Sequence, residues 1–320
     1  MSSTQSIPAQ STGDAGSTGR PLVSVIMATY NRSNIIGYSI RSLLASTQQD
    51  WELIVVGDAC TDDTEAVVAA FSDPRIRFVN LERNCGEQSG PNNAGVALAR
   101  GRYLAFLNHD DLWLPGHLTA LLDAIQADRA DLAFSIGMLV ADDGPVDSLV
   151  GAVTSTGRYH TALGVPASLW LMRRDLPVRV GPWHSAFGLR VASSQDWLYR
   201  AYRAAAGIVA VPKVTAVLIP SGGVRDSYRA RLADAHARYF DSCREPDFVS
   251  RTLLQLQLRW EDKRWYAGGG GLVLEGIKAI GRQCLRRLGV FPSTPRHFLI
   301  LPRKGGLIRR LRRTRGLDPI

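Results

Sequence analysis

The sequence predicts an α/β protein with a doubly wound, mainly parallel sheet flanked by helices and a basic helical C-terminal extension. Three observations support this prediction. Apolar strand-like runs alternate with helical segments through the first half of the chain. Clusters of polar residues follow these runs, where ligands of such sheets bind. Residues 251–320 hold 16 Lys and Arg against 4 Asp and Glu, whereas the other 250 residues hold 22 against 25.

The composition is that of a globular protein, with 45% hydrophobic and 21% charged residues in a chain of 320. This length suits one large domain or two smaller ones. Residues 1–20 are rich in Ser, Thr, Gln and Gly and lack the apolar segment of a secretory signal, so we expect a disordered leader. No run approaches the roughly 20 apolar residues of a membrane-spanning helix. The four cysteines lie far apart, which favours free thiols in a reducing cytosol over a zinc site or disulfides.

The first half of the chain is expected to alternate strands with helices. Apolar runs of strand length occur at Leu22–Ala28, Trp51–Val56, Ile76–Val79 and Tyr103–Leu107. Helices are expected between them and after them, over 33–46, from Thr61, over Pro91–Ala99, and from Pro115, where proline suits a first helical turn.

The second half is less regular. It offers a strand-like segment at Ser168–Met172, a helix near Ser194–Ala206 and an apolar run at Ile208–Ile219. Beyond residue 250 the pattern becomes basic and amphipathic, and the chain contains no internal repeat.

Four polar clusters fall at the expected carboxyl ends of strands or in the loops that follow them. They are Thr29–Arg32, Asp58–Asp62, Asn84–Asn93 and Asn108–Asp111. Because the carboxyl ends of parallel strands meet at one edge of a sheet, these clusters predict one site. The first junction has no glycine-rich GxGxxG motif, which weakens a dinucleotide-binding interpretation.

In their order and spacing, these motifs resemble the family 2 glycosyltransferases of the GT-A fold. The resemblance covers residues 21–115 well and 165–205 more loosely. It implies inverting transfer of a sugar from a nucleotide diphosphate sugar to an acceptor hydroxyl, with a nucleotide-sugar-binding half at 21–114. The acceptor-binding and catalytic half would then be 115–235, followed by the basic extension at 236–320.

The resemblance also implies a divalent cation. In the family, the carboxylates of a DXD motif hold Mg²⁺ or Mn²⁺ against the donor diphosphate, and Asp110 occupies the last position of that motif, followed by Asp111 as a further acid. Asn108 replaces the first Asp, which retains an acceptor oxygen but removes a charge. His109 is expected to contact the donor sugar or support the structure, because Mg²⁺ disfavours imidazole. The alternative is a pair of acids that cap the following helix.

The same resemblance assigns the nucleotide pocket. Asp58 matches the acid that binds the base, and a carboxylate that accepts an imide N–H favours uracil or thymine over cytosine. Guanine also offers such an N–H, so UDP-, dTDP- and GDP-linked donors stay open. The residues expected to lie along the base and ribose are Thr29, Tyr30, Asn31 and Arg32. Gly86 and Asn93 match the family's loop that crosses the nucleotide. A solvated helix start is the alternative role for Arg32.

The catalytic base is expected from Ser193–Arg200, which resembles the family's Glu-Asp motif with Gln195 in place of Glu. Asp196 falls on the catalytic position, where a carboxylate takes the acceptor's proton; its alternative role is to stabilise the helix dipole. Arg225 is either a mobile cation over the diphosphate or an ordinary surface residue. Trp183 and His184 either line the acceptor side or belong to the core.

The tail predicts an anionic partner. Residues 272–291 place apolar and basic side chains on different helical faces, and a second basic block with interleaved apolar residues follows at 303–313. Such a helix suits an anionic membrane interface. The alternative is a helix packed on the catalytic domain; nucleic acid is not expected, because no stacking aromatics interleave the charges.

These features together predict a cytoplasmic enzyme, peripheral on the inner face of the plasma membrane if the tail binds it. Its acceptor would be a saccharide or lipid-linked saccharide in surface polysaccharide or glycolipid synthesis. Two alternatives stay open: a nucleotide-sugar-binding scaffold that has lost catalysis, favoured by Asn108 and Gln195, and a sugar-phosphate nucleotidyltransferase, disfavoured by the missing glycine-rich loop after the first strand.

Overall fold

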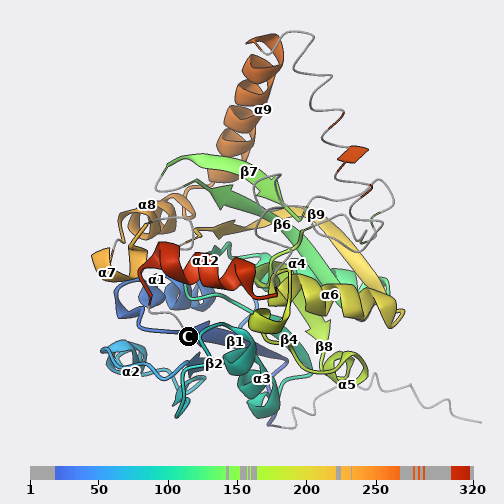
Figure 1. Ribbon diagram of the computed structural model, residues 1–320. Helices are drawn as coiled ribbons and strands as arrows, with labels where there is room; N and C mark the ends of the chain where they lie inside the picture. The colour runs from blue at the N-terminus through green and yellow to red at the C-terminus, as the bar shows by residue number, and fades with distance from the viewer. Residues whose placement is uncertain are drawn as a thin grey trace, which may run out of the picture.

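The computed structural model describes two stretches of the chain, which fold around one sheet of nine strands with helices on both faces (Figure 1). The described residues are 19–266 and 304–317, except 142–143, 152–156, 158, 160–163, 221–224 and 232, together with 277, 280, 281 and 284. Nearly all of the predicted leader and of the predicted helix over 272–291 lies outside these residues. The predicted halves at 21–114 and 115–235 both contribute strands to the single sheet.

The sheet has the strand order β3-β2-β1-β4-β8-β6-β9-β5, and β7 pairs with β6. Its strands are β1 (Val23–Thr29), β2 (Trp51–Gly57), β3 (Ile76–Asn80), β4 (Tyr103–Phe106), β5 (Asp111–Trp113), β6 (Leu132–Val140), β7 (Val146–Val150), β8 (Trp170–Arg173) and β9 (Ile208–Leu218).

The first half of the sheet is parallel, as the sequence predicts. β1 pairs with β2 and β4, and β2 pairs with β3, all in parallel register. Every residue of β2 and β4 is buried. Parallel strands that are covered on both faces appear in a sequence as nearly continuous apolar runs, which explains why these strands could be predicted.

The second half of the sheet is mixed. β8 lies antiparallel between β4 and β6, β9 runs parallel to β6, and β5 runs antiparallel to β9. The α/β fold class is confirmed, but the sheet is parallel chiefly in its first half. The short strand β5 begins at Asp111, so this acid is held by sheet pairing as well as by its side chain.

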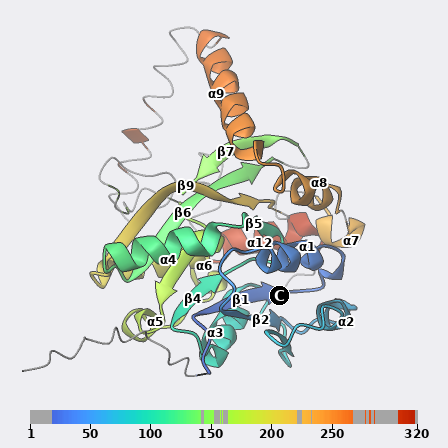
Figure 2. The ribbon, with the colours of Figure 1, turned by 180° about the vertical axis from the view of Figure 1, so that it is seen from behind.

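Helices cover both faces of the sheet. Figure 2 shows α4 and α1 on one face, whereas α6 and α12 lie on the face turned toward the viewer in Figure 1. The helices are α1 (Ser33–Leu44), α2 (Thr64–Ala69), α3 (Ser89–Leu98), α4 (His117–Ala127), α5 (Leu176–Val180), α6 (Ser193–Arg203), α7 (Ser227–Ala230), α8 (Asp234–Ser242), α9 (Phe248–Tyr266) and α12 (Gly306–Arg315), with 3₁₀ turns η1 (Ala167–Leu169) and η2 (Ala186–Gly188).

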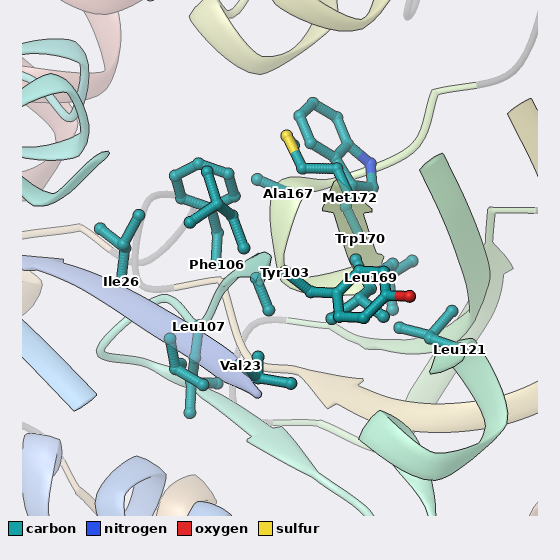
Figure 3. Close-up of a cluster of buried hydrophobic side chains, with 14 of the residues drawn as sticks. Val23, Ile26, Tyr103, Phe106, Leu107, Leu121, Ala167, Leu169, Trp170 and Met172 are labelled. Carbon is teal, nitrogen blue, oxygen red and sulfur yellow. The ribbon is translucent and has the colours of Figure 1, made fainter. Parts of the chain in front are cut away.

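The core lies between the sheet and these helices. Figure 3 shows Phe106 of β4 beside Trp170 of β8. Trp170, Trp183 and Trp197 are buried and stack on one another at centroid distances of 5.8 to 6.1 Å. Trp183 is therefore part of the core, which is the second of the two roles the sequence left open for it.

Helix α9 projects from the body (Figure 1) and exposes Leu254, Leu258 and Trp260. Within the described part of the chain, no helix combines the length and apolar composition needed to cross a bilayer.

Candidate active site

A cavity of about 460 Å³ opens at the carboxyl ends of β1, β2 and β4, where the sequence predicts a site. Three of the four polar clusters contribute lining residues directly after these strands, and the loop that precedes α3 contributes Gly86. The predicted residues that line this cavity are Thr29, Tyr30, Asp58, Gly86, Asn108, His109, Asp110 and Asp111. The volume lies within the range that small-molecule sites occupy.

Asp58 follows β2 and fastens the neighbouring loop. Its Oδ1 accepts the backbone N–H of Cys85 at 2.6 Å, and its Oδ2 accepts that of Gly86 at 2.9 Å. Burial raises the pKa of the Asp58 carboxyl, and these two hydrogen bonds oppose the rise. Each carboxylate oxygen carries two lone pairs, so Asp58 can hold this loop and still accept a hydrogen bond from a ligand.

Asp111 is a buried carboxylate bound from three sides. Asn108 Nδ2 donates to its Oδ2 at 2.9 Å, the Ser168 hydroxyl donates to the same oxygen, and the Ile219 N–H donates to Oδ1 at 3.3 Å. Burial, and then the adjacent charge of Asp110, raise the pKa of Asp111 well above its usual range. The Asn108 amide that replaces a carboxylate of the motif therefore serves Asp111 as a hydrogen-bond donor.

His109 presents one ring nitrogen to the backbone and lines the cavity. Its Nδ1 lies 3.0 Å from the carbonyl oxygen of Ala28, which can only accept, so Nδ1 carries the proton of the neutral ring. Burial lowers the pKa of His109, which favours this neutral form. Its buried Nε2 has no hydrogen-bond partner among the described residues. The site therefore holds an acceptor nitrogen beside Asp110.

The acids of this cluster can supply some of the ligands of a divalent cation, and the substrate and water would supply the rest. Asp110 is buried, lines the cavity and repels Asp111, so a cation at Asp110 would offset that repulsion. Asp111 is already bound by three donors within the protein, which reduces its capacity to bind a cation. The described residues contain no group of three or more acidic, His or Cys side chains that could hold a metal by themselves. Mg²⁺ commonly takes one or two protein carboxylates and completes its coordination with water and substrate phosphates.

Two predicted nucleotide residues, Asn31 and Arg32, lie next to the cavity without lining it. Asn31 accepts the backbone N–H of Thr61 at 2.8 Å and so joins the first junction to the second. Arg32 is 1% exposed, donates to the Ser227 carbonyl at 3.0 Å and stacks 4.3 Å from the Tyr228 ring. Arg32 is therefore buried, and the alternative of a solvated helix start is wrong.

Asn93 and Arg225 also lie apart from the cavity lining. The side-chain amide of Asn93 binds the backbone of Trp183 at both ends: Oδ1 accepts the N–H at 2.8 Å and Nδ2 donates to the carbonyl at 3.0 Å, so this residue ties α3 to the aromatic core. The Arg225 side chain is 92% exposed and lies 3.6 Å from Asp226.

Asp196 sits in the first turn of α6 beside the cavity wall. Its Oδ2 lies 2.9 Å from Arg200 Nε and 3.0 Å from His184 Nδ1. Ser193, three residues earlier on the same helix, lines the cavity, whereas Asp196 is not among the lining residues. His184 thus contacts the predicted base.

The cavity includes residues that the sequence analysis did not assign to it. Glu87 lines the cavity and accepts hydrogen bonds from Ser89 and from Ser193 Oγ at 3.1 Å. Tyr228 lies at its edge, stacked 6.4 Å from Tyr30. Helix α12 supplies a further wall through Leu307, Ile308, Leu311, Arg312 and Arg315. The basic block at 303–313 is the sequence feature that could have indicated this wall. Its amphipathic pattern, however, suits a helix on a membrane and a helix against a cavity equally.

Known proteins are similar to this chain over the part that builds the cavity. Residues 24–169 match the family model described as glycosyl transferase family 2. The succinoglycan biosynthesis protein ExoO of Rhizobium meliloti (strain 1021) is 39% identical over 124 residues, which are 39% of this chain and 35% of that protein. The putative teichuronic acid biosynthesis glycosyltransferase TuaG of Bacillus subtilis (strain 168) is 36% identical over 147 residues, which are 45% of this chain and 58% of that protein.

The name of a third relative states its donor and acceptor. The UDP-Glc:alpha-D-GlcNAc-diphosphoundecaprenol beta-1,3-glucosyltransferase WfgD of Escherichia coli is 41% identical over 97 residues, 30% of this chain and 38% of that protein. The chain thus matches between about a third and three fifths of the length of these curated relatives.

Two solved structures share the fold. The crystal structure of S. aureus TarS in complex with UDP-GlcNAc has a TM-score of 0.52 at 21% identity and covers 62% of this chain and 58% of that one. The mannosyltransferase PcManGT from Pyrobaculum calidifontis, in complex with GDP-Man and Mn²⁺, has a TM-score of 0.51 at 16% identity and covers 92% and 88%. These likenesses establish a GT-A-like fold.

Proposed function

Because residues 24–169 match the model of glycosyl transferase family 2, we propose that the protein transfers a sugar from a nucleotide diphosphate sugar to an acceptor hydroxyl. The observation that carries the proposal is the single cavity at the carboxyl ends of the parallel strands. It combines Asp58, the predicted contact to the base, with the acids at Asn108–Asp111, the predicted contact to the diphosphate.

The residues take the following roles. Asp58 accepts an N–H of the base while it holds the loop at Gly86, and Tyr30 lies beside it on the cavity wall. Asp110 would hold Mg²⁺ or Mn²⁺, and Asp111, to which Asn108 donates a hydrogen bond, would support it. When bound, this cation neutralises charge that develops on the leaving diphosphate.

Transfer proceeds with inversion, since Asp196 removes the acceptor's proton from the side opposite the leaving group. His184 and Arg200 hold its carboxylate in place at the start of α6.

The proposed acceptor is a saccharide or lipid-linked saccharide in surface polysaccharide or glycolipid synthesis. The support for this proposal is that the named relatives act in succinoglycan, teichuronic acid and diphosphoundecaprenol-linked glycan synthesis. UDP- and GDP-linked donors are candidates because TarS is described with UDP-GlcNAc and PcManGT with GDP-Man. A dTDP-linked donor is a candidate because thymine offers Asp58 the same imide N–H as uracil. The enzyme would work in the cytoplasm, where such donors are made available, on the inner face of the plasma membrane.

The membrane role proposed for the tail now concerns residues 272–291, which lie almost entirely outside the described residues. In the described part, α12 packs against the domain with Ile308 and Arg312 buried, and its apolar side chains line the cavity. That face of α12 is not available to a bilayer in this arrangement.

A donor-hydrolysis assay tests the proposed function. Purified protein is incubated with UDP-, dTDP- and GDP-sugars and Mn²⁺, and release of nucleoside diphosphate is measured with and without lipid-linked saccharides. We expect slow release from one class of donor and faster release with acceptor; proton NMR of the product then reads the anomeric configuration. Binding of a nucleoside diphosphate without turnover of any donor would favour the catalytically degenerate scaffold instead. Synthesis of nucleotide-sugars from sugar phosphates would favour the nucleotidyltransferase.

A further inference from the structure

Helix α12 closes one side of the cavity, although more than a hundred residues separate it from the segment that matches the family model. Figure 1 shows α12 lying across the middle of the molecule, in front of the sheet and between α7 and α6. Its side chains Leu307, Leu311, Arg312 and Arg315 line the cavity.

Hydrogen bonds fix α12 at both ends and in the middle. The N–H of Gly305 donates to the carbonyl of Leu189 at 2.7 Å, and the N–H of Asp226 donates to the carbonyl of Thr314 at 2.7 Å. Between these points, Arg312 Nη1 donates to the carbonyl of Gly86 at 2.9 Å. The helix is therefore a built wall of the cavity rather than a segment that rests on the surface.

The charges in the cavity are divided between the strand ends and α12. The acids come from the loops after the strands and from the loop before α3: Asp58, Glu87, Asp110 and Asp111. Among the described residues that line the cavity, both guanidinium groups, Arg312 and Arg315, come from α12. A nucleotide diphosphate carries several negative charges, which carboxylates repel and these two guanidinium groups attract.

Arg315 lines the same cavity as the acidic side chains. It sits at the edge of the cavity with its Cζ 6.0 Å from the Tyr228 ring, and its buried Nε has no hydrogen-bond partner among the described residues. Arg32 approaches the same ring, with its Cζ 4.3 Å from the centroid of Tyr228, so two guanidinium groups lie near one aromatic side chain. Arg32 and Arg315 repel each other, and an anion bound at Arg315 would offset that repulsion.

We propose that Arg315 binds the diphosphate of the donor and that Arg312 positions the Gly86 loop over the nucleotide. This inference rests on the proposed function and adds to it a binding residue from outside the family-matched segment. Arg312 and Asp58 hold the same loop, so the C-terminal helix and the second strand both set its position.

Binding measurements on the full chain test this proposal. Isothermal titration calorimetry would use UDP, dTDP and GDP and the matching nucleosides, in EDTA and again in Mn²⁺, with wild type, Arg315→Met, Arg315→Lys and Arg313→Met. Arg313 is the matched control, because it lies on the same helix, is exposed and does not line the cavity.

We expect Arg315→Met to lower the affinity for the nucleoside diphosphate that wild type binds by roughly tenfold or more, since a charge-assisted contact is lost. Binding of the nucleoside should change little, Arg315→Lys should recover part of the loss, and Arg313→Met should match wild type. Unchanged diphosphate binding by Arg315→Met would overturn the inference, as would an equal loss for the nucleoside, which would indicate a purely structural role. A wild type that binds none of the three diphosphates would overturn the proposed function and this inference with it.

Discussion

Asp58 and Arg312 hold opposite sides of Gly86. The Asp58 carboxylate accepts the N–H of Gly86 at 2.9 Å, and the Arg312 guanidinium donates to its carbonyl at 2.9 Å. Two side chains separated by 254 positions thus fix one glycine whose φ of +75° lies in the left-handed region.

This arrangement predicts that the two side chains are coupled. A double-mutant cycle with Asp58→Asn and Arg312→Met, read by the affinity for the nucleoside diphosphate, should show an interaction free energy of about 0.5 kcal/mol or more. Each single change frees one side of the loop, so the second change costs less than the first. The control cycle pairs Asp58→Asn with Arg313→Met and should be additive. Additivity in both cycles would mean that Asp58 and Arg312 are not coupled through the Gly86 loop.

Asp110 is predicted to be the metal ligand. Asp110→Asn keeps the shape of the side chain and removes its charge, so turnover should fall by roughly 10²-fold or more and Mn²⁺ should no longer enhance nucleotide binding. The assay is donor hydrolysis together with calorimetry at several Mn²⁺ concentrations. Asn108→Asp should retain activity or bind Mn²⁺ more tightly. Full metal-dependent turnover by Asp110→Asn would exclude this role.

The catalytic base is predicted to be Asp196. Asp196→Asn cannot accept the proton, so turnover should fall by roughly 10²-fold or more while donor binding is retained. Glu87→Gln is the comparison, because Glu87 is the carboxylate of the α3 loop that lines the cavity. Steady-state rates of transfer and the melting temperature are measured for both. A larger rate loss in Glu87→Gln, with Asp196→Asn affected only in melting temperature, would assign the base to Glu87.

Docking of α12 is predicted to depend on Gly305. This residue has a φ of +74°, and a Cβ there would lie 2.8 Å from the carbonyl oxygen of Phe187. Gly305→Ala should therefore weaken docking by about 1–2 kcal/mol and lower the affinity for the nucleoside diphosphate. Gly116→Ala is the control, because no atom lies within 4 Å of its added Cβ. Equal nucleotide affinity in the two variants would show that the wall tolerates the strain.

The buried His117 is predicted to make the protein sensitive to acid. Its Nδ1 lies 2.7 Å from Thr215 Oγ1 and its ring stacks on Trp113 at 4.2 Å, and burial lowers its pKa to about 3. Because the unfolded chain titrates near 6.5, the unfolded state binds the extra proton between these values. Stability from this residue is complete above pH 6.5 and is lost as pH falls toward 3, by up to about 1.4 kcal/mol per pH unit.

The measurement is the free energy of unfolding in urea against pH, for wild type and for His117→Gln. The difference between the two curves separates the contribution of His117 to the pH dependence from those of Asp111 and His236. Burial lowers the pKa of His236 to about 4. A constant difference from pH 7 to pH 4 would contradict the prediction.

The parallel half of the fold was predictable from the sequence, because β1, β2 and β4 are almost wholly buried and appear as mainly apolar runs, whereas β3 at the sheet edge is only partly buried. β6 carries a similar apolar run, Leu132–Val140, but it was not among the predicted strands. The antiparallel positions of β5 and β8 were likewise not predictable. Pairing partners depend on the path of the whole chain, and Asp111–Trp113 is too short to show a period of two.

The candidate site was predictable where loops follow parallel strands and less so elsewhere. Asp58 and Asp110 lie in the cavity because the strands before them end there. Asn93 was assigned to the nucleotide from the resemblance, but its amide holds the backbone of Trp183, ninety positions away. The side-chain directions of Arg312 and Arg315 depend on how α12 docks. An amphipathic basic pattern alone does not distinguish a bilayer from a cavity.

The docking of α12 also bears on how the protein folds. The bond between Arg312 and Gly86 spans 226 positions, so forming it closes a very long loop of chain, and such closures cost entropy before the contacts they bring can compensate. The pairs β1–β2 and β2–β3 are far more local and can form without it. The sheet can therefore be assembled while the cavity still lacks its basic wall, and during refolding the ability to bind a nucleotide should return later than the strand signal.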